Sequence, residues 1–412
     1  MYNHTSSEFV CGACFSDDGL QEFCANHAES NECDFCGATG TEPIAAPLDQ
    51  VIEHISGCVH MHYDDPANAG LPYETAEDGY QGATYSTDEV FDELGLDFPK
   101  DKGNRLRDAI ADGFDNDLWS DAEPFALTRD QQLRFSWEQF CRVIKHERRY
   151  FFLQDDEKKP RHYDDELFGP AQILKMIFSF AEDADAFAKL PAGTHLYRAR
   201  YQPKGKTYAT AGTLGPPPTD HAIKTNRMSP PGVVMTYASE DRETALAETT
   251  DEAGTFAVGK FVTERDALVL DLTRLPATPS VFAEFPDTQM YDPRPRLNFL
   301  HNISREISRP IARDNRVHIE YVPTQVVTEY VRTAIRIKGR KVEGIRYNSS
   351  RRHAETALVL FADQRNLILD EPERPDFYRL EGRWLRLVKA SRTEVTKKDI
   401  ARWAAKPRLR LF

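Results

Sequence analysis

The chain has 412 residues, of which 40% are apolar and 29% are charged, as in an ordinary soluble protein of two or three domains. The net charge is −14, which argues against general binding of nucleic acid through its phosphates. No run of about 18 apolar residues occurs, so we expect no transmembrane helix and no membrane partner. The first residues lack the basic and apolar regions of a signal peptide, so we expect a cytoplasmic protein.

Acidic and basic residues are unevenly distributed along the chain. Residues 62–123 contain 17 Asp or Glu and 4 Lys or Arg, whereas residues 371–412 contain 12 basic and 6 acidic residues. The basic C-terminal segment could bind an acidic partner, or the acidic segment could mimic such a partner. The simpler interpretation is solubility, with weak attraction between the two segments.

Six of the seven cysteines lie in the first 58 residues, and four of them form two CxxC pairs. Cys11 and Cys14 form the first pair, Cys33 and Cys36 form the second, and 18 residues separate the pairs. Each CxxC turn directs two sulfurs at one metal, and this spacing is typical of a four-thiolate Zn²⁺ site. Four thiolates leave no open coordination position, so the zinc is predicted to be structural.

Cys24 and His27 lie between the two cysteine pairs and are alternative metal ligands. We prefer the interpretation that LQEFCANH is a small helix packed beneath the metal. A segment as short as residues 1–45 cannot bury a sufficient core without its metal. We therefore predict a zinc knuckle over residues 1–45.

Residues 46–155 are predicted to form an acidic helical domain. STDEVFDEL carries a helix start with an acidic first turn. The clearest helix is TRDQQLRFSWEQFCRVIKHERRYFFL, whose apolar residues recur at helical spacing. The polar segment from Gln154 to Glu166 contains a proline and is the predicted domain boundary.

The segments from residue 165 onward alternate between helix-like and strand-like patterns. PAQILKMIFSFAEDADAFAKLP, residues 170–191, reads as an amphipathic helix with Pro170 in its first turn. The strand-like segments are 196–201, 233–238, 256–262, 267–272, 342–347 and 356–362, and the helix-like segments are 241–250, 298–307 and 322–335. Ser239 is the predicted N-cap of the first of these helices. The fold class is therefore α+β, with a central β-sheet in a domain over residues 165–390 and a basic tail over 391–412.

The usual enzyme motifs do not occur in the sequence. There is no P-loop, no GxGxxG after a strand, no GxSxG elbow and no HExxH. Chemistry must therefore come from Arg, Tyr, Glu and Ser residues that stand at strand ends.

Six ordered segments resemble the RES domain family, over roughly residues 190–370. They are LYRARY, TLGPPP, NRMSPPGVVMTYASEDRETALAE, LVLDLT, EYVPTQVVTEYV and GIRYNSSRRHAETALVLF. The preceding region, with WEQFCRVIKHERRYFF, resembles the HEPN/RES N-terminal type. The resemblance implies an ADP-ribosyltransferase-like fold and a toxin that consumes NAD, in toxin–antitoxin or anti-phage defence. NAD would be degraded by phosphorolysis or hydrolysis, or its ADP-ribose would be transferred to a protein.

The resemblance implies that two arginines hold the phosphates of NAD. Arg198 matches the first arginine of the family, and Arg227 matches a second, preceded by Asn226 where the family has glycine. A guanidinium can hold a pyrophosphate with two hydrogen bonds. Both Asn and Gly tolerate positive φ, so we expect the turn to be kept. Arg200 lies on the same side of the strand as Arg198 and is the alternative to it.

Tyr237, Glu248 and Ser349 complete the site that the resemblance implies. Tyr237 would lie near the nicotinamide, because an aromatic face can stack on a cationic pyridinium. Glu248 would stabilise the positive charge that develops on the ribose, and Glu243 is the other acidic candidate in the same helix. Ser349 would bind the nicotinamide amide or a phosphate, and Ser350 is its alternative. Each residue alone is also explained by packing, an exposed helix surface or a turn.

Two functions of other classes stay open. One is an N-terminal HEPN-type ribonuclease, but the family spaces its Arg and His more widely than Arg142 and His146 are spaced here. The other is a non-catalytic binding module built from the zinc knuckle and the acidic helices. The predicted partners are NAD and an antitoxin or trigger protein, and the sequence leaves open whether the acceptor is phosphate, water or a protein side chain.

Overall fold

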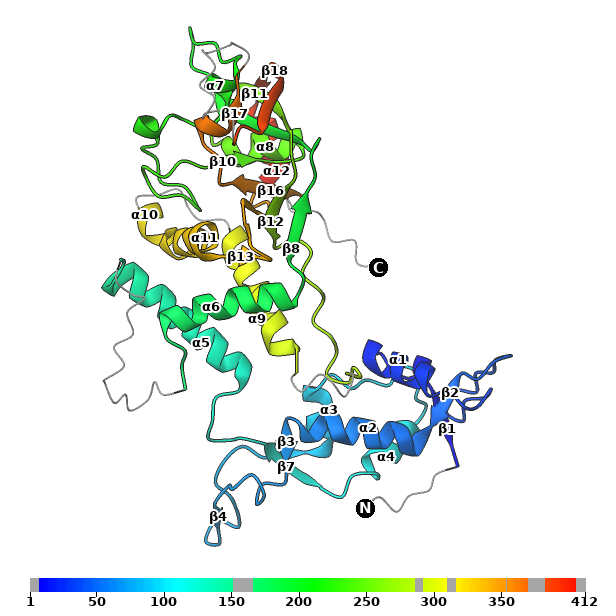
Figure 1. The fold of residues 1–412 in the computed structure, drawn as a ribbon. Coiled ribbons are helices and arrows are strands. Elements are labelled where there is room, and N and C mark those ends of the chain that lie inside the picture. The colour runs from blue at the N-terminus through cyan, green and yellow to red at the C-terminus, as the bar shows by residue number, and fades with distance from the viewer. Residues whose placement is uncertain are drawn as a thin grey trace. The chain divides into compact units, whose positions relative to one another are not determined.

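Packing divides the protein into two compact units. The first comprises residues 1–131 and 277–295, and the second comprises residues 132–276 and 296–412. The computed structural model describes residues 7–150, 166–285, 292–309, 316–352, 354–369 and 382–404. Each unit is thus assembled from two separate stretches of sequence, whose elements are labelled in Figure 1.

The first unit opens with a small two-stranded sheet and two helices. Its elements are β1 (Phe9–Cys11), η1 (Gly12–Cys14), α1 (Asp18–Asn26), β2 (Ala45–Pro47) and α2 (Leu48–His60). α1 begins at Asp17, whose carboxylate accepts a hydrogen bond of 3.0 Å from the backbone N–H of Leu20. Phe282, from the second stretch, is fully buried in this core, and Ser280 donates a hydrogen bond of 2.6 Å to Asp17. The core of this unit therefore requires residues far apart in the sequence.

The rest of the first unit is made of short strands and helices. They are β3 (Tyr63–Asp64), β4 (Tyr73–Glu74), β5 (Gly79–Tyr80), β6 (Tyr85–Ser86), α3 (Thr87–Glu93), α4 (Arg105–Ala111) and β7 (Leu118–Asp121). The predicted helix start in STDEVFDEL is a capping box: Ser86 accepts from the N–H of Glu89, and the Glu89 carboxylate accepts from the N–H of Ser86.

The second unit contains a five-stranded sheet in the order β10-β16-β15-β12-β8. The bounds of these strands are β8 (Phe187–Leu190), β10 (Thr236–Ala238), β12 (Ala267–Asp271), β15 (Gly344–Asn348) and β16 (Thr356–Leu360). β12 and β15 are parallel, and the other neighbours are antiparallel. Tyr237 lies opposite Val359, and Tyr347 lies opposite Ala357 on the same strand. Since residues two apart share a face, Tyr237 and Tyr347 lie on the same face of this sheet.

A four-stranded sheet in the order β17-β18-β11-β9 lies in the same unit. Its strands are β9 (His195–Tyr201), β11 (Gly254–Thr263), β17 (Leu367–Ile368) and β18 (Leu385–Val395). An isolated bridge between Tyr197 and Ser239 joins β9 to the end of β10. The predicted central sheet is therefore two sheets in the structure, while the predicted mixture of helices and strands is confirmed.

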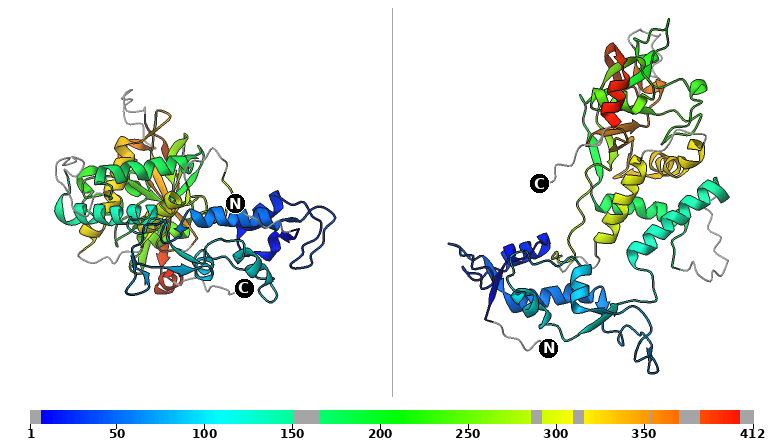
Figure 2. Two further views of the ribbon diagram at one scale, coloured as in Figure 1. Left: turned by 90° about the horizontal axis from the view of Figure 1, so that it is seen from below. Right: turned by 180° about the vertical axis from the view of Figure 1, so that it is seen from behind.

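The sheets and helices of the second unit are arranged in layers. One face of the five-stranded sheet, with Leu270 and Ile345, packs on helices, and the other, with Val269 and Leu358, packs on the four-stranded sheet. The helices are α5 (Arg129–Arg142), η2 (Val143–Glu147), α6 (Pro170–Asp183), α9 (Arg294–Ser308), α10 (Val317–Glu320) and α11 (Val322–Ala334). Figure 2 shows them from two further directions.

The far side of the four-stranded sheet is covered by two more helices. They are α8 (Arg242–Thr249) and α12 (Lys397–Ala404), which contribute Leu246 and Trp403 to one apolar cluster with β9, β11 and β18. The remaining elements are α7 (Ala211–Leu214), η3 (Thr219–His221), β13 (Arg336–Ile337), β14 (Arg340–Lys341) and η4 (Gln364–Asn366).

Several boundaries differ from the sequence predictions. The helix predicted over 170–191 ends at Asp183, because Asp185 takes a φ of 49° and the chain then enters β8. Ser239 does not cap α8: Asp241 accepts from the N–H of Thr244 at 2.7 Å, and Ser239 instead donates to the carbonyl of Thr356.

The domain ranges 1–45, 46–155, 165–390 and 391–412 stay predictions. The packing divides the chain at other places, because α5 contributes Leu133 and Phe140 to the core of the second unit. The predicted basic tail contains the end of β18 and all of α12. Its last residues, 405–412, lie outside the described part of the chain.

Candidate functional site

Arg198 lies on β9, half-buried, and its guanidinium is fixed by two backbone carbonyls. Nη1 donates to the carbonyl oxygen of Tyr237 at 2.9 Å, and Nε donates to that of Gly215 at 3.3 Å. Burial, helped by the positive charge of Arg200, lowers the pKa of Arg198 to about 10. Arg198 therefore stays charged at neutral pH.

Arg200, the alternative to Arg198, is engaged at another place. Its Nη1 donates to the carbonyl oxygen of Thr213 at 2.6 Å, and its guanidinium lies over the ring of Tyr208 at 4.5 Å. Only Arg198 of the two has a described hydrogen bond to Tyr237. The choice of Arg198 over Arg200 stays a prediction.

Arg227 lies on the loop that precedes β10. Its guanidinium carbon lies 5.6 Å from the centre of the Tyr321 ring. Its Nη1 is buried and has no hydrogen-bond partner among the described residues. A buried donor without a partner costs about 1–3 kcal/mol, so an acceptor that reached this atom would remove the penalty.

The turn before Arg227 is not kept in the expected form. Asn226 is not among the described residues with positive φ. Its N–H instead donates to the carbonyl oxygen of Ser229 at 2.9 Å, and its side-chain amide donates to the hydroxyl of Ser229 at 3.3 Å. Hydrogen bonds within the loop, rather than a left-handed backbone, therefore shape this segment.

Tyr237 connects the two arginines. Its carbonyl accepts from Arg198, while its hydroxyl accepts from the N–H of Met228 at 3.2 Å and lies 3.0 Å from the hydroxyl of Ser229. Burial raises the pKa of Tyr237 to about 12, so the phenol is neutral at physiological pH. The hydroxyl thus holds the loop that carries Arg227.

Glu248 lies near the end of α8, and two serines lie against its carboxylate. Ser349 donates to Oε1 at 2.5 Å, whereas Ser350 lies 3.4 Å from both oxygens. Ser349 also accepts from the N–H groups of Arg351 and Arg352 at 3.2 and 3.1 Å. These bonds make Ser349 the closer partner of the two serines.

Glu243, the other acidic candidate, is bound in surface ion pairs. Its carboxylate lies 3.1 Å from Arg402 and 3.6 Å from Arg352. Glu248 accepts hydrogen bonds from the two serines. The two carboxylates of α8 therefore have different surroundings.

The sequence analysis did not single out Tyr347. This residue is 3% exposed, and burial, followed by the nearby charge of Glu248, raises its pKa well above the usual value. The sequence feature that could have identified Tyr347 is its position in the strand GIRYN, two residues before Ser349. Its side chain there lies on the same face of the strand as that of Ile345.

The four cysteines of the knuckle converge as predicted. All four sulfurs lie within 4.8 Å of one another. Cys11–Cys14, Cys11–Cys36 and Cys14–Cys33 have sulfur–sulfur distances of 3.9, 3.5 and 3.7 Å. A tetrahedron with Zn–S bonds of 2.3 Å has edges of about 3.8 Å, so the donor set fits a zinc ion.

The thiols of this cluster interact strongly. Burial raises the pKa of Cys11 to about 11, and hydrogen bonding from Cys14, then from backbone N–H groups, lowers that of Cys33 to about 4. Several thiolates can share so small a volume only when a cation compensates their charge. Gly37 follows the second knuckle with a φ of 69°, a conformation that favours glycine there.

Cys24 and His27 do not belong to the cluster. Cys24 is fully buried on α1, where burial raises its pKa to about 12, and His27 follows the helix and bonds to Glu284 at 3.0 Å. The prediction of a small packed helix is therefore confirmed for LQEFCANH, which shares a core with the clustered cysteines, while the metal itself stays a prediction.

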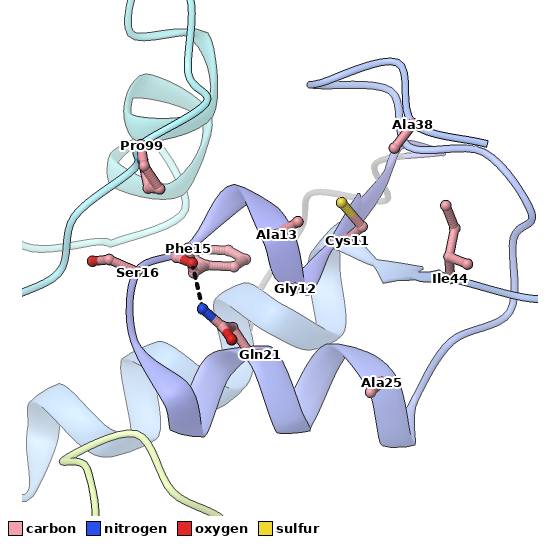
Figure 3. A pocket seen from close by; sticks show the side chains of 10 residues that line it. All are labelled: Cys11, Gly12, Ala13, Phe15, Ser16, Gln21, Ala25, Ala38, Ile44 and Pro99. Carbon is pink, nitrogen blue, oxygen red and sulfur yellow. Dashed lines mark hydrogen bonds between the residues drawn. The ribbon is translucent and has the colours of Figure 1, made fainter. Parts of the chain in front are cut away.

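A cavity of about 590 Å³ lies beside the knuckle (Figure 3). One wall is formed by Cys11 and Phe15, and the amide of Gln21 donates to the carbonyl oxygen of Phe15 at 3.0 Å. Among the described residues that line it, Cys11 is the only one with a titratable side chain. The described lining therefore provides no carboxylate or histidine for acid–base catalysis.

Arg142 and His146 are both exposed, at the end of α5 and in η2. Arg142 lies 3.4 Å from Glu147. This contact gives Arg142 a surface ion pair and adds no support for a ribonuclease site.

Two family models match the chain. One, described as HEPN/RES N-terminal domain 1, matches residues 26–158, and the other, described as RES domain, matches residues 195–380. The second match contains all five predicted catalytic residues, whereas the first begins after Cys11 and Cys14. No curated protein and no solved structure gives a significant match. Among the described residues, no helix is long and apolar enough to cross a membrane.

Proposed function

Because the chain belongs to the RES domain family and carries a HEPN/RES N-terminal region, we propose that it cleaves the nicotinamide–ribose bond of NAD. The observation that carries the proposal is the hydrogen bond from Ser349 to Glu248, formed between a turn and a helix that are 101 residues apart. Tyr347, on the strand that leads to this turn, lies on the same face of the sheet as Tyr237.

Arg198 and Arg227 are proposed to hold the phosphates of NAD. The described hydrogen bonds of Arg198 use Nε and Nη1, which leaves Nη2 for a phosphate oxygen. In Arg227 the buried Nη1 lacks a partner among the described residues. Charge-assisted bonds from guanidinium to phosphate are among the stronger hydrogen bonds in proteins, so a bound phosphate would compensate these donors.

Glu248 is proposed to stabilise the transition state. When the C–N bond to ribose breaks, its electron pair leaves with nicotinamide, which becomes a neutral pyridine and needs no protonation. Positive charge develops on the ribose, where a carboxylate stabilises it. An oxygen of water or phosphate then bonds to the anomeric carbon, and a proton from water or from the phosphate is released. The hydrogen bond from Ser349 holds the carboxylate in one orientation.

The alternative within this site is transfer of ADP-ribose to a protein, which differs only in the acceptor. Incubation of the zinc-loaded protein with NAD, with and without inorganic phosphate, separates these outcomes by mass spectrometry. Free ADP-ribose indicates hydrolysis, ADP-ribose phosphate indicates phosphorolysis, and a mass increase of the protein indicates transfer. If nicotinamide is released in none of these reactions, and Glu248→Gln behaves as wild type, the proposed function is wrong.

The four cysteines are proposed to hold a structural zinc ion. The sulfur–sulfur distances carry this proposal, because they fit the edges of a tetrahedral site. On family grounds we also propose a cytoplasmic toxin-like role in toxin–antitoxin or anti-phage defence, restrained or triggered by a partner protein. The test is to co-express a candidate partner with the wild-type protein. Relief of toxicity while the amount of the wild-type protein is unchanged would support the partner.

A further inference from the structure

We propose that Thr324 and Gln325, in the first turn of α11, are positioning residues that fix Arg227 for substrate binding. This inference rests on the proposed function of Arg227 in holding NAD. Neither residue was singled out from the sequence, although both lie in the segment EYVPTQVVTEYV.

Both side chains are buried and form hydrogen bonds to the loop that carries Arg227. Gln325 is 8% exposed, and its Nε2 donates to the carbonyl oxygen of Asn226 at 2.8 Å and to the hydroxyl of Thr225 at 2.9 Å. Thr324 is 5% exposed, and its hydroxyl proton is shared between the carbonyl oxygen of Arg227 itself and that of Tyr321 at 2.9 Å. The start of α11 therefore holds three consecutive residues of the loop.

The other end of the same loop is held by Tyr237. Its hydroxyl accepts from the N–H of Met228 and lies against the hydroxyl of Ser229. Arg227 stands between these two anchors. Its backbone is thus restrained from the helix on one side and from the sheet on the other.

The side chain of Arg227 is restrained from the same turn of α11. Tyr321, which immediately precedes the helix and is 8% exposed, places its ring 5.6 Å from the guanidinium carbon. A cation–π contact of this kind orients a guanidinium without using its N–H donors. The contacts therefore fix the position of the guanidinium while Nη1 stays without a partner among the described residues.

This combination distinguishes positioning from ordinary packing. Most buried arginine donors in proteins are paired, because each unsatisfied donor is costly. Here several buried groups hold a loop in place, and a buried donor of the residue they hold has no partner among the described residues. Such prior ordering reduces the entropy that is lost when an anionic ligand binds.

The test compares two matched substitutions on one helix. Thr324→Val removes the hydroxyl that bonds to Arg227, whereas Thr328→Val removes a similarly buried hydroxyl whose described bond lies within the helix, to the carbonyl oxygen of Thr324 at 2.7 Å. Gln325→Met keeps the length of the side chain and removes its two donated bonds. We expect Thr324→Val and Gln325→Met to raise KM for NAD about tenfold with kcat within about threefold of wild type, and Thr328→Val to leave both unchanged.

A second measurement does not depend on activity. The side-chain N–H resonance of Arg227, assigned by its loss in Arg227→Lys, should shift in Thr324→Val and Gln325→Met and not in Thr328→Val. If the wild type does not consume NAD, the proposed function is wrong. The spectrum alone then tests whether Thr324 and Gln325 position Arg227. An unshifted resonance, or equal KM values for Thr324→Val and Thr328→Val, would overturn the inference.

Discussion

The hydroxyl and the ring of Tyr237 make different contacts, and Tyr237→Phe removes the hydroxyl alone. The substitution keeps the aromatic face that is proposed to meet the nicotinamide. It removes the acceptor for the N–H of Met228, a residue that is 1% exposed, at a distance of 3.2 Å. The hydroxyl of Ser229 keeps a second partner, the amide of Asn226 at 3.3 Å. One buried N–H is therefore left unpaired.

An unsatisfied buried N–H lowers the free energy of unfolding by about 1–3 kcal/mol. For a domain of this size each kcal/mol lowers Tm by about 2–4 °C. Because the loop of Arg227 loses one of its two anchors, we also expect KM for NAD to rise. The ring is retained, so kcat should stay near that of the wild type, whereas Tyr237→Ala should lower kcat as well.

Tyr330→Phe is the matched control, since Tyr330 is also half-buried against the same apolar core. The described residues provide no hydrogen bond to its hydroxyl, and its ring stacks on Phe178. Thermal unfolding followed by circular dichroism and steady-state kinetics give both readouts. If Tyr237→Phe unfolds at the same temperature as Tyr330→Phe and has the same KM, the assignment of the hydroxyl to the loop is wrong.

Three further predictions follow from the same contacts. Glu248→Gln should lower kcat/KM by about 10²–10³, the usual effect of removing an electrostatic stabiliser, whereas Glu243→Gln should leave it within about threefold, as measured by NAD consumption. Cys33→Ser should abolish zinc binding and unfold the first unit, while Cys24→Ser should keep one zinc per chain, as measured by metal analysis and circular dichroism. The raised pKa of Tyr237 gives stability that is complete below about pH 10 and is lost as pH rises toward about 12, so alkaline unfolding should be less steep in Tyr237→Phe, as judged by denaturant titration at each pH.

The sequence predicted the strands that carry the site better than the contacts within it. Alternating apolar residues and the ordered family segments located β9, β10 and β15, together with Arg198 and Tyr237 within the first two strands and Ser349 just after the third. Sequence alone left Ser349 and Ser350 equivalent, because adjacent serines differ only in where the turn directs each hydroxyl. The structure separates them by hydrogen bonds of 2.5 and 3.4 Å to Glu248.

Other features depend on contacts between distant segments and could not be predicted. Gln325 appears in the sequence as one residue of an amphipathic helix, and its role is visible only from its bonds to Thr225 and Asn226, about a hundred residues earlier. The N-cap prediction for Ser239 failed for the same reason, since Thr356 from the neighbouring strand takes its hydroxyl. β8 was missed because its apolar pattern continues that of the preceding helix until Asp185 turns the chain.

The segment around Phe282 has a consequence for how the protein is made. The unit that carries the four cysteines needs Phe282 in its core and Ser280 against Asp17, the N-cap of α1, yet more than half of the chain is synthesised between Asp17 and Ser280. Domains that fold during translation usually complete themselves in N- to C-terminal order. The first unit cannot fold in this order. Its four cysteines are translated first, but its core is complete only after the strands with Arg198 and Tyr237 have been translated. A fragment that ends after α5 would therefore carry all four cysteines and still lack part of its own interior.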